Sequence, residues 1–226
     1  MNLGPYELNT IVTGDARILA EVISDNSVDL IFTDPVYQNI EDYGWLARMA
    51  ARVLKPEKSV LAQCGNIYRF DCELAMSKFG LVHNPLILDY YEFSQHSIYK
   101  LKLVANVSPW VWYSKGSADN PFIPIAQSSY KAMGRQNNGR PISKIFFKWG
   151  DEETYYLKRI KAFTQPGAIV FDPFTGGGTV PAVCKMLGRN YLAFEIDPET
   201  ANKARQRVEM TQPPLFVLQP EQGELF

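Results

Sequence analysis

The chain has 226 residues, of which 46 % are hydrophobic and 21 % charged, and its net charge is −1. These values are typical of one globular α/β domain with a full core. No run approaches the ~18 apolar residues of a membrane span, and Met1–Thr10 lacks the pattern of a secretory signal, so we expect a cytoplasmic protein without a membrane partner. The three cysteines form no C-x-x-C pair, and neither histidine has zinc-site spacing, which argues against a disulfide framework or a metal site.

Strand-like and helical stretches alternate in the first part of the chain. Val28–Thr33 has the β-branched and aromatic residues of a strand, and apolar residues at helical spacing predict a helix over Tyr43–Leu54 that Lys55-Pro56 ends. Ser59–Gln63 is the next predicted strand, and Ile67–Lys78 the next helix. Residues 81–93 and 103–114 are rich in β-formers.

The same alternation returns near the C-terminus. The pattern predicts helices over Glu153–Phe163, Gly178–Leu187 and Pro198–Met210, and strands over Ala168–Phe171 and Asn190–Glu195. Strands that alternate with helices are typical of a mostly parallel sheet with crossover helices.

The middle of the chain differs in composition and charge. Lys115–Gly139 is rich in glycine, serine, asparagine, proline and glutamine, and is predicted to be an inserted loop region. Lys100–Lys148 holds eight basic residues and a single acid, a charge of +7, so the remaining chain carries −8. A local basic zone on an acidic chain indicates a surface for a polyanion. We therefore expect a single domain, residues 1–226, with an inserted recognition region at about 115–144 and a flexible tail at about 212–226.

The stretch FDPFTGGGTV, Phe171–Val180, predicts a ligand loop at the carboxyl end of a strand. Glycines there allow the backbone to approach a ligand closely, beside a helix N-terminus. Glu195, at the end of the next strand, is placed to accept hydrogen bonds from ribose hydroxyls. A dinucleotide fingerprint needs a third glycine where Pro181 stands, and a phosphate loop needs a lysine that is absent. The loop therefore fits a nucleoside ligand that has no pyrophosphate, such as S-adenosylmethionine.

A second stretch, IFTDPVYQN at Ile31–Asn39, ends an apolar strand on Asp34-Pro35 and then places Tyr37. Asp-Pro is common turn chemistry. The alternative is a clamp that holds a flat, hydrogen-bonding ring.

Together the two stretches resemble the amino-methylating DNA methyltransferases. DPFTGGGT resembles their cofactor motif DPF-x-G-x-GT, and TDPVY resembles their catalytic D-P-P-Y, with Val36 in place of the second proline. The catalytic motif comes first, as in the β group of the family, and GDA (Gly14–Ala16), RVLKPEK (Arg52–Lys58) and FTQPGAIVFDPF add to the likeness. The resemblance covers most of Thr13–Val208. It implies a Rossmann-like, S-adenosylmethionine-dependent fold with a mixed, mostly parallel seven-stranded sheet, a circularly permuted motif order and a small inserted target-recognition region.

The resemblance also implies roles for individual residues. Asp15 has a second interpretation, as the cap of the helix that follows it. The implied catalytic residues are Asp34, Pro35 and Tyr37; the implied cofactor-binding residues are Asp15, Phe32, Asp34, Asp172, Phe174, Gly176, Gly178, Thr179 and Glu195; the basic residues expected to bind DNA are Lys115, Lys131, Arg135, Arg140 and Lys144.

The implied activity is site-specific methylation of the exocyclic N6 amine of a flipped adenine in double-stranded DNA, in a bacterial or phage-infected cell, as in restriction-modification. The motif order argues against an RNA or protein-glutamine methyltransferase, and the lack of a Pro-Cys pair argues against methylation of a cytosine ring carbon. N4-cytosine methylation and a catalytically silent DNA-binding protein remain as alternatives. Members of the family often form homodimers. QPPLF (Gln212–Phe216) and QGELF (Gln222–Phe226) resemble peptides that dock on sliding clamps, but a flexible tail that packs one or two apolar residues is the favoured interpretation.

Overall fold

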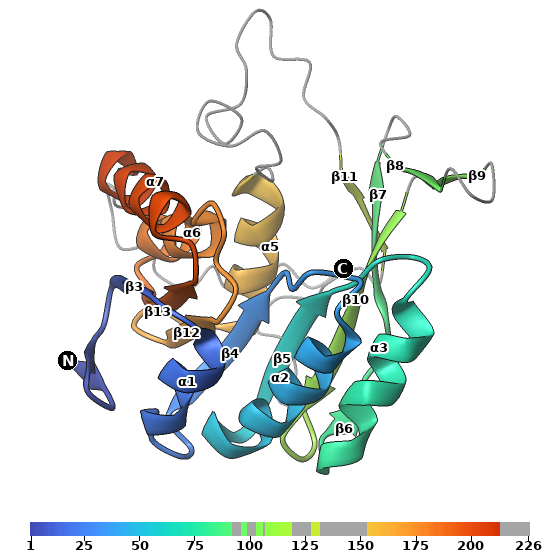
Figure 1. The fold of residues 1–226 in the computed structure, drawn as a ribbon, viewed down its shortest axis with the longest axis horizontal. Coiled ribbons are helices and arrows are strands. Elements are labelled where there is room, and N and C mark those ends of the chain that lie inside the picture. The colour runs from blue at the N-terminus through green and yellow to red at the C-terminus, as the bar shows by residue number, and fades with distance from the viewer. Residues whose placement is uncertain (92–95, 99–102, 106, 119–127, 132–152, 213–226) are drawn as a thin grey trace, which may run out of the picture.

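The computed structural model describes residues 1–91, 96–98, 103–105, 107–118, 128–131 and 153–212. Its centre is a nine-stranded sheet (Figure 1) in the order β11-β7-β10-β5-β4-β12-β13-β3, with β6 paired to β10. The strands are β3 (Thr10–Thr13), β4 (Val28–Thr33), β5 (Leu54–Gln63), β6 (Val82–His83), β7 (Ile87–Tyr91), β10 (Val107–Ser114), β11 (Ser128–Lys131), β12 (Ile169–Asp172) and β13 (Asn190–Glu195).

The pairs that β10 makes with β5, β6 and β7 are antiparallel, and the other pairs are parallel. The predicted mixed, mostly parallel Rossmann-like class is confirmed, with nine described strands instead of seven. The sequence patterns predict no strand at β3, and β11 lies where they predict a loop region. Two small antiparallel sheets pair β1 (Asn2–Leu3) with β2 (Tyr6–Glu7), and β8 (His96–Ile98) with β9 (Leu103–Ala105).

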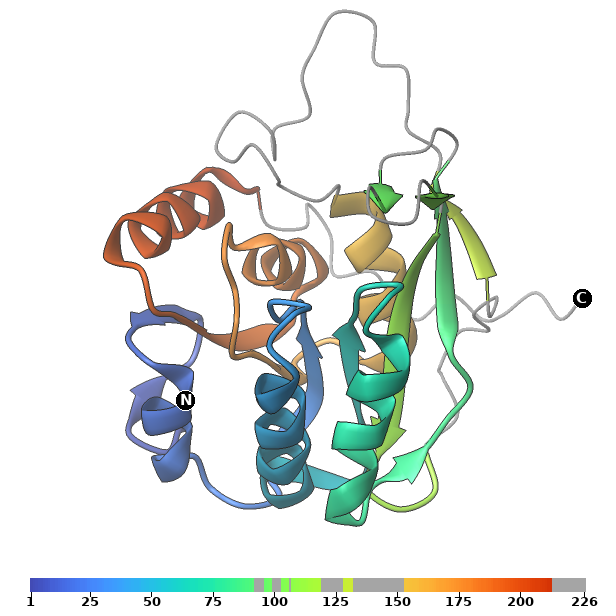
Figure 2. The same ribbon diagram turned by 45° about the vertical axis from the view of Figure 1, so that its right-hand side comes forward.

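Helices cover both faces of the sheet, as Figures 1 and 2 show. One buried core lies under α1, α2 and α3, and a second lies under α5, α6 and α7. The described α-helices are α1 (Ala16–Leu19), α2 (Ile40–Val53), α3 (Arg69–Met76), α5 (Glu153–Phe163), α6 (Thr179–Leu187) and α7 (Pro198–Met210), with short 3-10 helices at Ala20–Val22 and Ser77–Phe79. None of these helices is long and apolar enough to cross a membrane.

Local signals explain where several helices begin and end. The Asp197 side chain accepts a 2.7 Å hydrogen bond from the backbone N–H of Thr200, and Pro198 is the first residue of α7. Gly188, with a φ of +66°, ends α6, because glycine adopts this left-handed conformation without a steric penalty. The helices over 153–163 and 198–210 thus have their predicted bounds, whereas α2 begins three residues earlier than expected.

The connections that follow β12 and β4 leave the sheet on opposite faces. These strands are parallel neighbours, with Phe171 beside Ile31. The chain runs from β12 to α6, over one core, and from β4 to α2, over the other. Such a topological switch point opens a crevice at the carboxyl ends of the strands, where ligands of open α/β sheets bind. The fold therefore brings the two predicted motifs to one crevice.

Candidate active site

A cavity of about 340 Å³ lies at this switch point, within the usual size range of small-molecule sites. Five predicted site residues line it: Asp15, Asp34, Phe174, Gly176 and Glu195. They come from the ends of β3, β4, β12 and β13. The cavity thus joins the TDPVY motif to the DPFTGGGT motif.

The cavity is acidic. Carboxylates of Asp15, Asp34, Asp42 and Glu195 line it, and Arg17 is the cationic residue among its lining residues. Aromatic and aliphatic side chains, including Phe174 and the 67 % exposed Ile196, form the apolar part of the wall. This lining suits a ligand with a flat ring, hydroxyl groups and positive charge.

Backbone groups hold Glu195 at the cavity. Its Oε2 accepts a 2.9 Å hydrogen bond from the Gly176 N–H, and its Oε1 accepts another of 2.9 Å from the Asp197 N–H. The carboxylate is therefore fixed between the glycine loop and the end of β13. Because a carboxylate has about four lone-pair positions, it retains capacity for ligand hydroxyls.

Asp15 caps a helix and also lies at the cavity. It is the N-cap of α1, and its Oδ1 accepts a 2.9 Å hydrogen bond from the Arg17 backbone N–H. It also lines the cavity. Capping and contact with a ligand are therefore compatible at this position.

Asp172 lies behind the cavity wall. Its side chain is buried, and its Oδ1 accepts hydrogen bonds from the Thr33 hydroxyl at 2.7 Å and from the Phe174 N–H at 3.3 Å. Burial raises the pKa of Asp172 to about 7, although the hydrogen bonds counteract this rise. This carboxyl orders the start of the glycine loop and is absent from the residues that line the cavity.

The catalytic motif forms the turn after β4. Asp34 is half-buried and faces the cavity, Pro35 is buried, and Val36 is 70 % exposed at the cavity's edge. Tyr37 is half-buried, and its side chain lies against Gly65, where an added Cβ would be only 3.1 Å from the Tyr37 Cβ. Glycine at position 65 thus leaves room for the tyrosine.

Two predicted cofactor residues contact α7. An added Cβ at Gly178, whose φ is +73°, would lie 2.9 Å from the Ala204 Cβ, so this glycine permits close packing of the loop on α7. The Thr179 hydroxyl accepts a 2.8 Å hydrogen bond from Arg207. Neither residue lines the cavity, and both shape the loop that does.

Phe32 does not reach the cavity. Its ring is fully buried, stacks on Trp110 with centroids 4.6 Å apart, and belongs to the core under α5–α7. Side chains alternate across a strand, so Phe32 points into this core while Ile31 points into the other. This placement argues against the expected contact of the Phe32 side chain with the cofactor.

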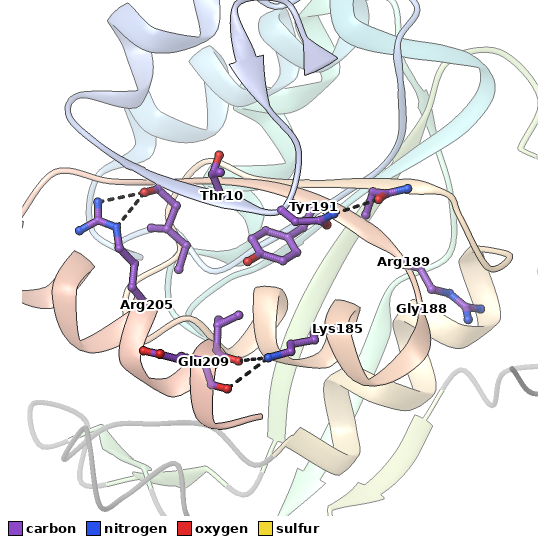
Figure 3. A pocket seen from close by; sticks show the side chains of 11 residues that line it. Thr10, Lys185, Gly188, Arg189, Tyr191, Arg205 and Glu209 are labelled. Atoms are coloured by element: carbon purple, nitrogen blue, oxygen red, sulfur yellow. Dashed lines mark hydrogen bonds between the residues drawn. The ribbon is translucent and has the colours of Figure 1, made fainter. Parts of the chain in front are cut away.

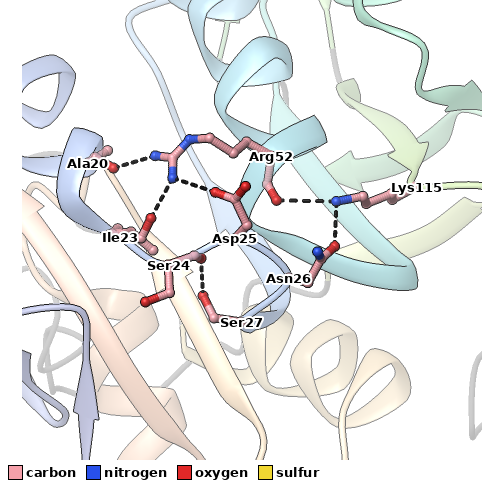
Figure 4. A network of polar contacts seen from close by, with 8 residues as sticks. All are labelled: Ala20, Ile23, Ser24, Asp25, Asn26, Ser27, Arg52 and Lys115. Carbon is pink, nitrogen blue, oxygen red and sulfur yellow. Dashed lines mark hydrogen bonds and ion pairs between the residues drawn. The ribbon is translucent and has the colours of Figure 1, made fainter.

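Lys115 lies at the opposite edge of the sheet from Asp34. It follows β10, which is antiparallel to β5, and its ammonium donates hydrogen bonds to Asn26 Oδ1 at 2.7 Å and to the Arg52 carbonyl at 3.2 Å (Figure 4). It anchors the loop before β4, because its ammonium is held by these two acceptors. Lys131, at the end of β11, lies beside Tyr91 at the carboxyl edge of the sheet. Arg135, Arg140, Lys144 and the tail 213–226 lie outside the described residues.

Sequence reasoning missed several residues that line the cavity. Arg17, Asn39 and Asp42 form a polar cluster there, and neither periodicity nor a motif marks them. Ile196 carried a signal, because it directly follows Glu195 at a strand end. Among the described residues, no group of three or more His, Cys, Asp and Glu side chains could hold a metal ion.

A larger cavity, of about 740 Å³, lies near the amino ends of β13 and β3 (Figure 3). Its cations already bind backbone carbonyls: Lys185 donates to Val208 O at 2.8 Å, and Arg205 donates to Ile11 O at 3.0 Å. None of the predicted site residues lines it. Because ligands of parallel sheets bind at the carboxyl ends of the strands, the smaller cavity is the stronger candidate.

Sequence comparisons identify relatives of this chain. A family model described as DNA methylase, of the N6/N4 methyltransferase type, matches residues 28–206. The type II methyltransferase M.HpaI of Haemophilus parainfluenzae is 26 % identical over 83 % of this chain and 70 % of its own length. The DNA adenine methyltransferase YhdJ of Escherichia coli K12 is 25 % identical over 90 % of this chain and 84 % of its own length.

Solved structures share the fold. The M1.HpyAVI–SAM complex superposes with a TM-score of 0.74 at 21 % identity, over 89 % of this chain and 99 % of that one. PvuII DNA methyltransferase, described as cytosine-N4-specific, superposes with a TM-score of 0.73 at 19 % identity, over 87 % and 85 % of the two chains.

Proposed function

This chain belongs to the N6/N4 family of DNA methylases, and from that premise we propose that it methylates the N6 amine of adenine in double-stranded DNA with S-adenosylmethionine as methyl donor. The observation that carries the proposal is the cavity that Asp34 and Glu195 share with the glycine loop. The relative described as a DNA adenine methyltransferase supports adenine, as does aspartate at the first position of TDPVY, where cytosine-specific members more often carry serine.

The residues of the cavity fit this cofactor. Glu195 is oriented to accept ribose hydroxyls, and Phe174 and Ile196 offer apolar surface for a ring. Gly176 has a φ of +48° and open space where a side chain would stand, so the backbone can approach a ligand closely. The excess of carboxylates favours a cation. When bound, the cofactor supplies a methyl carbon attached to a positively charged sulfur.

The TDPVY turn would activate the base. The exocyclic amine of adenine is a poor nucleophile, because its lone pair is delocalised into the ring. The Asp34 carboxylate and the Pro35 carbonyl can accept its two hydrogens and free the lone pair for a pyramidal nitrogen. Methylation exchanges one N–H bond for an N–CH3 bond, and Asp34 would hold the hydrogen that leaves as a proton. A carboxylate beside a nitrogen that becomes positive also stabilises the transition state.

Tyr37 would stack on the target base, which must leave the duplex to reach the cavity. Such stacking is worth roughly 1–3 kcal/mol. The support is its position two residues from Pro35, where Gly65 leaves room for the side chain.

N4-cytosine methylation is the second candidate. Val36, 70 % exposed, stands where the family motif has its second proline, and a less rigid turn can hold the amine of a different base. The same substitution is the one feature that favours a silent DNA-binding protein. Turnover on any duplex would exclude the silent protein.

The test is methylation of mixed-sequence duplex DNA with radiolabelled S-adenosylmethionine, followed by nucleoside analysis, with Asp34→Ala in parallel. The expected product is N6-methyladenine that disappears in the variant. N4-methylcytosine would keep the mechanism and change the base. No product on DNA, with S-adenosylhomocysteine still bound, would contradict the proposal, and Val36→Pro would then test the silent alternative.

A further inference from the structure

Asp42, in the first turn of α2, binds side chains from two segments that line the active-site cavity. Its Oδ1 accepts a hydrogen bond from Nη2 of Arg17, on α1, and its Oδ2 accepts one of 2.7 Å from Nδ2 of Asn39. Arg17 follows Asp15 by two residues, and Asn39 ends the loop that begins at Asp34. The three side chains thus connect segment 14–17 to the loop 34–39.

The Asp42 carboxylate is largely shielded from water and needs its two donors. The Asp42 side chain is 10 % exposed and that of Arg17 is 43 % exposed. A buried carboxylate is costly unless it is paired and hydrogen-bonded. Burial raises the pKa of Asp42, while Arg17 and Asn39 act in the opposite direction. The charged form of Asp42 therefore depends on both donors, and their segments are held where these donors can reach it.

Capping of α2 explains only half of the arrangement. Asn39 is the N-cap residue of α2, and the Asp42 N–H donates to the Asn39 carbonyl at 3.1 Å, so the Asn39–Asp42 contact belongs to the helix start. Arg17 comes from another element, 25 residues earlier, and contributes nothing to that cap. Its ion pair with Asp42 is the part that joins two different elements at the cavity wall.

We propose that Asp42 is a positioning residue of the active site, which holds segment 14–17 and the loop 34–39, through Arg17 and Asn39, at the separation that the cofactor needs. This inference rests on the proposed function. Asp42 acts through the placement of Asp15 and Asp34 and takes no part in the methyl transfer.

The test compares Asp42→Asn, Arg17→Gln and the double variant with the wild type. Asp25→Asn is the control, because the exposed Asp25–Arg52 pair, at 3.0 Å, lies at the other edge of the sheet. Calorimetry measures the affinity for S-adenosylhomocysteine, kinetics give KM and kcat separately, and urea unfolding reports stability. Each single variant should bind S-adenosylhomocysteine about tenfold more weakly, and the double variant no more weakly than either single one. KM for the methyl donor should rise in proportion, and Asp25→Asn should match the wild type.

Three results would overturn this role for Asp42. Wild-type affinity in both single variants would show that the cavity does not depend on the pair. Losses that add in the double variant would show that Arg17 and Asp42 act independently. If the loss of affinity is fully explained by the fraction of each variant that is unfolded, as urea unfolding measures it, Asp42 only stabilises the fold. If the wild type itself binds no S-adenosylhomocysteine, the proposed function fails instead.

Discussion

The Thr33 hydroxyl donates a 2.7 Å hydrogen bond to Asp172 Oδ1, across 139 positions of sequence. Thr33 precedes Asp34, the proposed catalytic residue, and Asp172 begins DPFTGGGT, the proposed cofactor motif. Both side chains are buried between the ends of β4 and β12. The two motifs are therefore coupled through one buried contact as well as through the cavity that they share.

Removal of this contact should destabilise the fold. In Thr33→Val the methyl groups fill the space of the threonine, but Asp172 loses one of its donors. Because a hydrogen bond contributes about 0.5–1.5 kcal/mol, and up to about 3 kcal/mol when it reaches a charged group, the free energy of unfolding in urea should fall by about 1–3 kcal/mol. Thr10→Val is the control: its hydroxyl bonds to the Glu7 carbonyl in an exposed position, and the expected change is within about 0.5 kcal/mol. Equal effects of both substitutions would contradict the importance of the Thr33–Asp172 bond.

The raised pKa of Asp172 predicts a pH dependence of stability. In the unfolded chain this carboxyl loses its proton near pH 4, whereas in the folded protein its pKa is about 7. Between these values the folded state binds more protons, so stability should fall as pH rises from about 4 to 7 and level off above. Asp172→Asn lacks this titration. Urea unfolding at several pH values should show the wild type losing, relative to the variant, on the order of 4 kcal/mol across that window. Parallel curves would show that Asp172 titrates normally.

The parts of the molecule that sequence predicts well are those set by local signals. Strand 190–195 and the helices over 153–163 and 198–210 have their predicted bounds, because apolar periodicity and the Asp197 cap mark them. The start of α2 was missed, since its first turn, with Glu41 and Asp42, is polar and shows no apolar period.

The site depended on a different kind of information. The motifs identified the residues of the two loops. The direction of each side chain, however, follows from the pleat of its strand, and this pleat points the Phe32 ring into the core. Lys115 shared the composition of the basic segment, yet the antiparallel course of β10 carried it to the far edge. The Arg17–Asp42 pair joins elements that only the folded chain brings together.

Gly65 offers a test of the tyrosine in TDPVY. In Gly65→Ala the new methyl group would crowd the Tyr37 side chain, whose Cβ, Cδ2 and Cγ lie within 3.3 Å of it. Loss of stacking worth roughly 1–3 kcal/mol should lower the methylation rate by between about fivefold and about 160-fold, with the affinity for S-adenosylhomocysteine unchanged. Gly44→Ala is the matched control, because its methyl group would meet only Phe79, at an ordinary 4.0 Å. A rate equal to the wild type in Gly65→Ala would argue against a stacked Tyr37.

Basic residues of the middle segment should differ in their effect on DNA binding. Arg135 and Arg140 belong to the basic segment proposed to bind DNA, whereas Lys115 binds Asn26 and the Arg52 carbonyl at the edge opposite Asp34. Fluorescence anisotropy with a mixed-sequence duplex, over a range of salt concentrations, compares Arg135→Gln/Arg140→Gln with Lys115→Gln. The double variant should bind more weakly, and its slope of log K against log salt should be shallower by about 0.9 for each phosphate contact removed. Lys115→Gln should keep both the affinity and the slope, because the Lys115 ammonium already donates hydrogen bonds to Asn26 and to the Arg52 carbonyl. If Lys115→Gln weakens binding as much as the double variant does, Lys115 contacts DNA as well, and the expected difference between Lys115 and the two arginines is wrong.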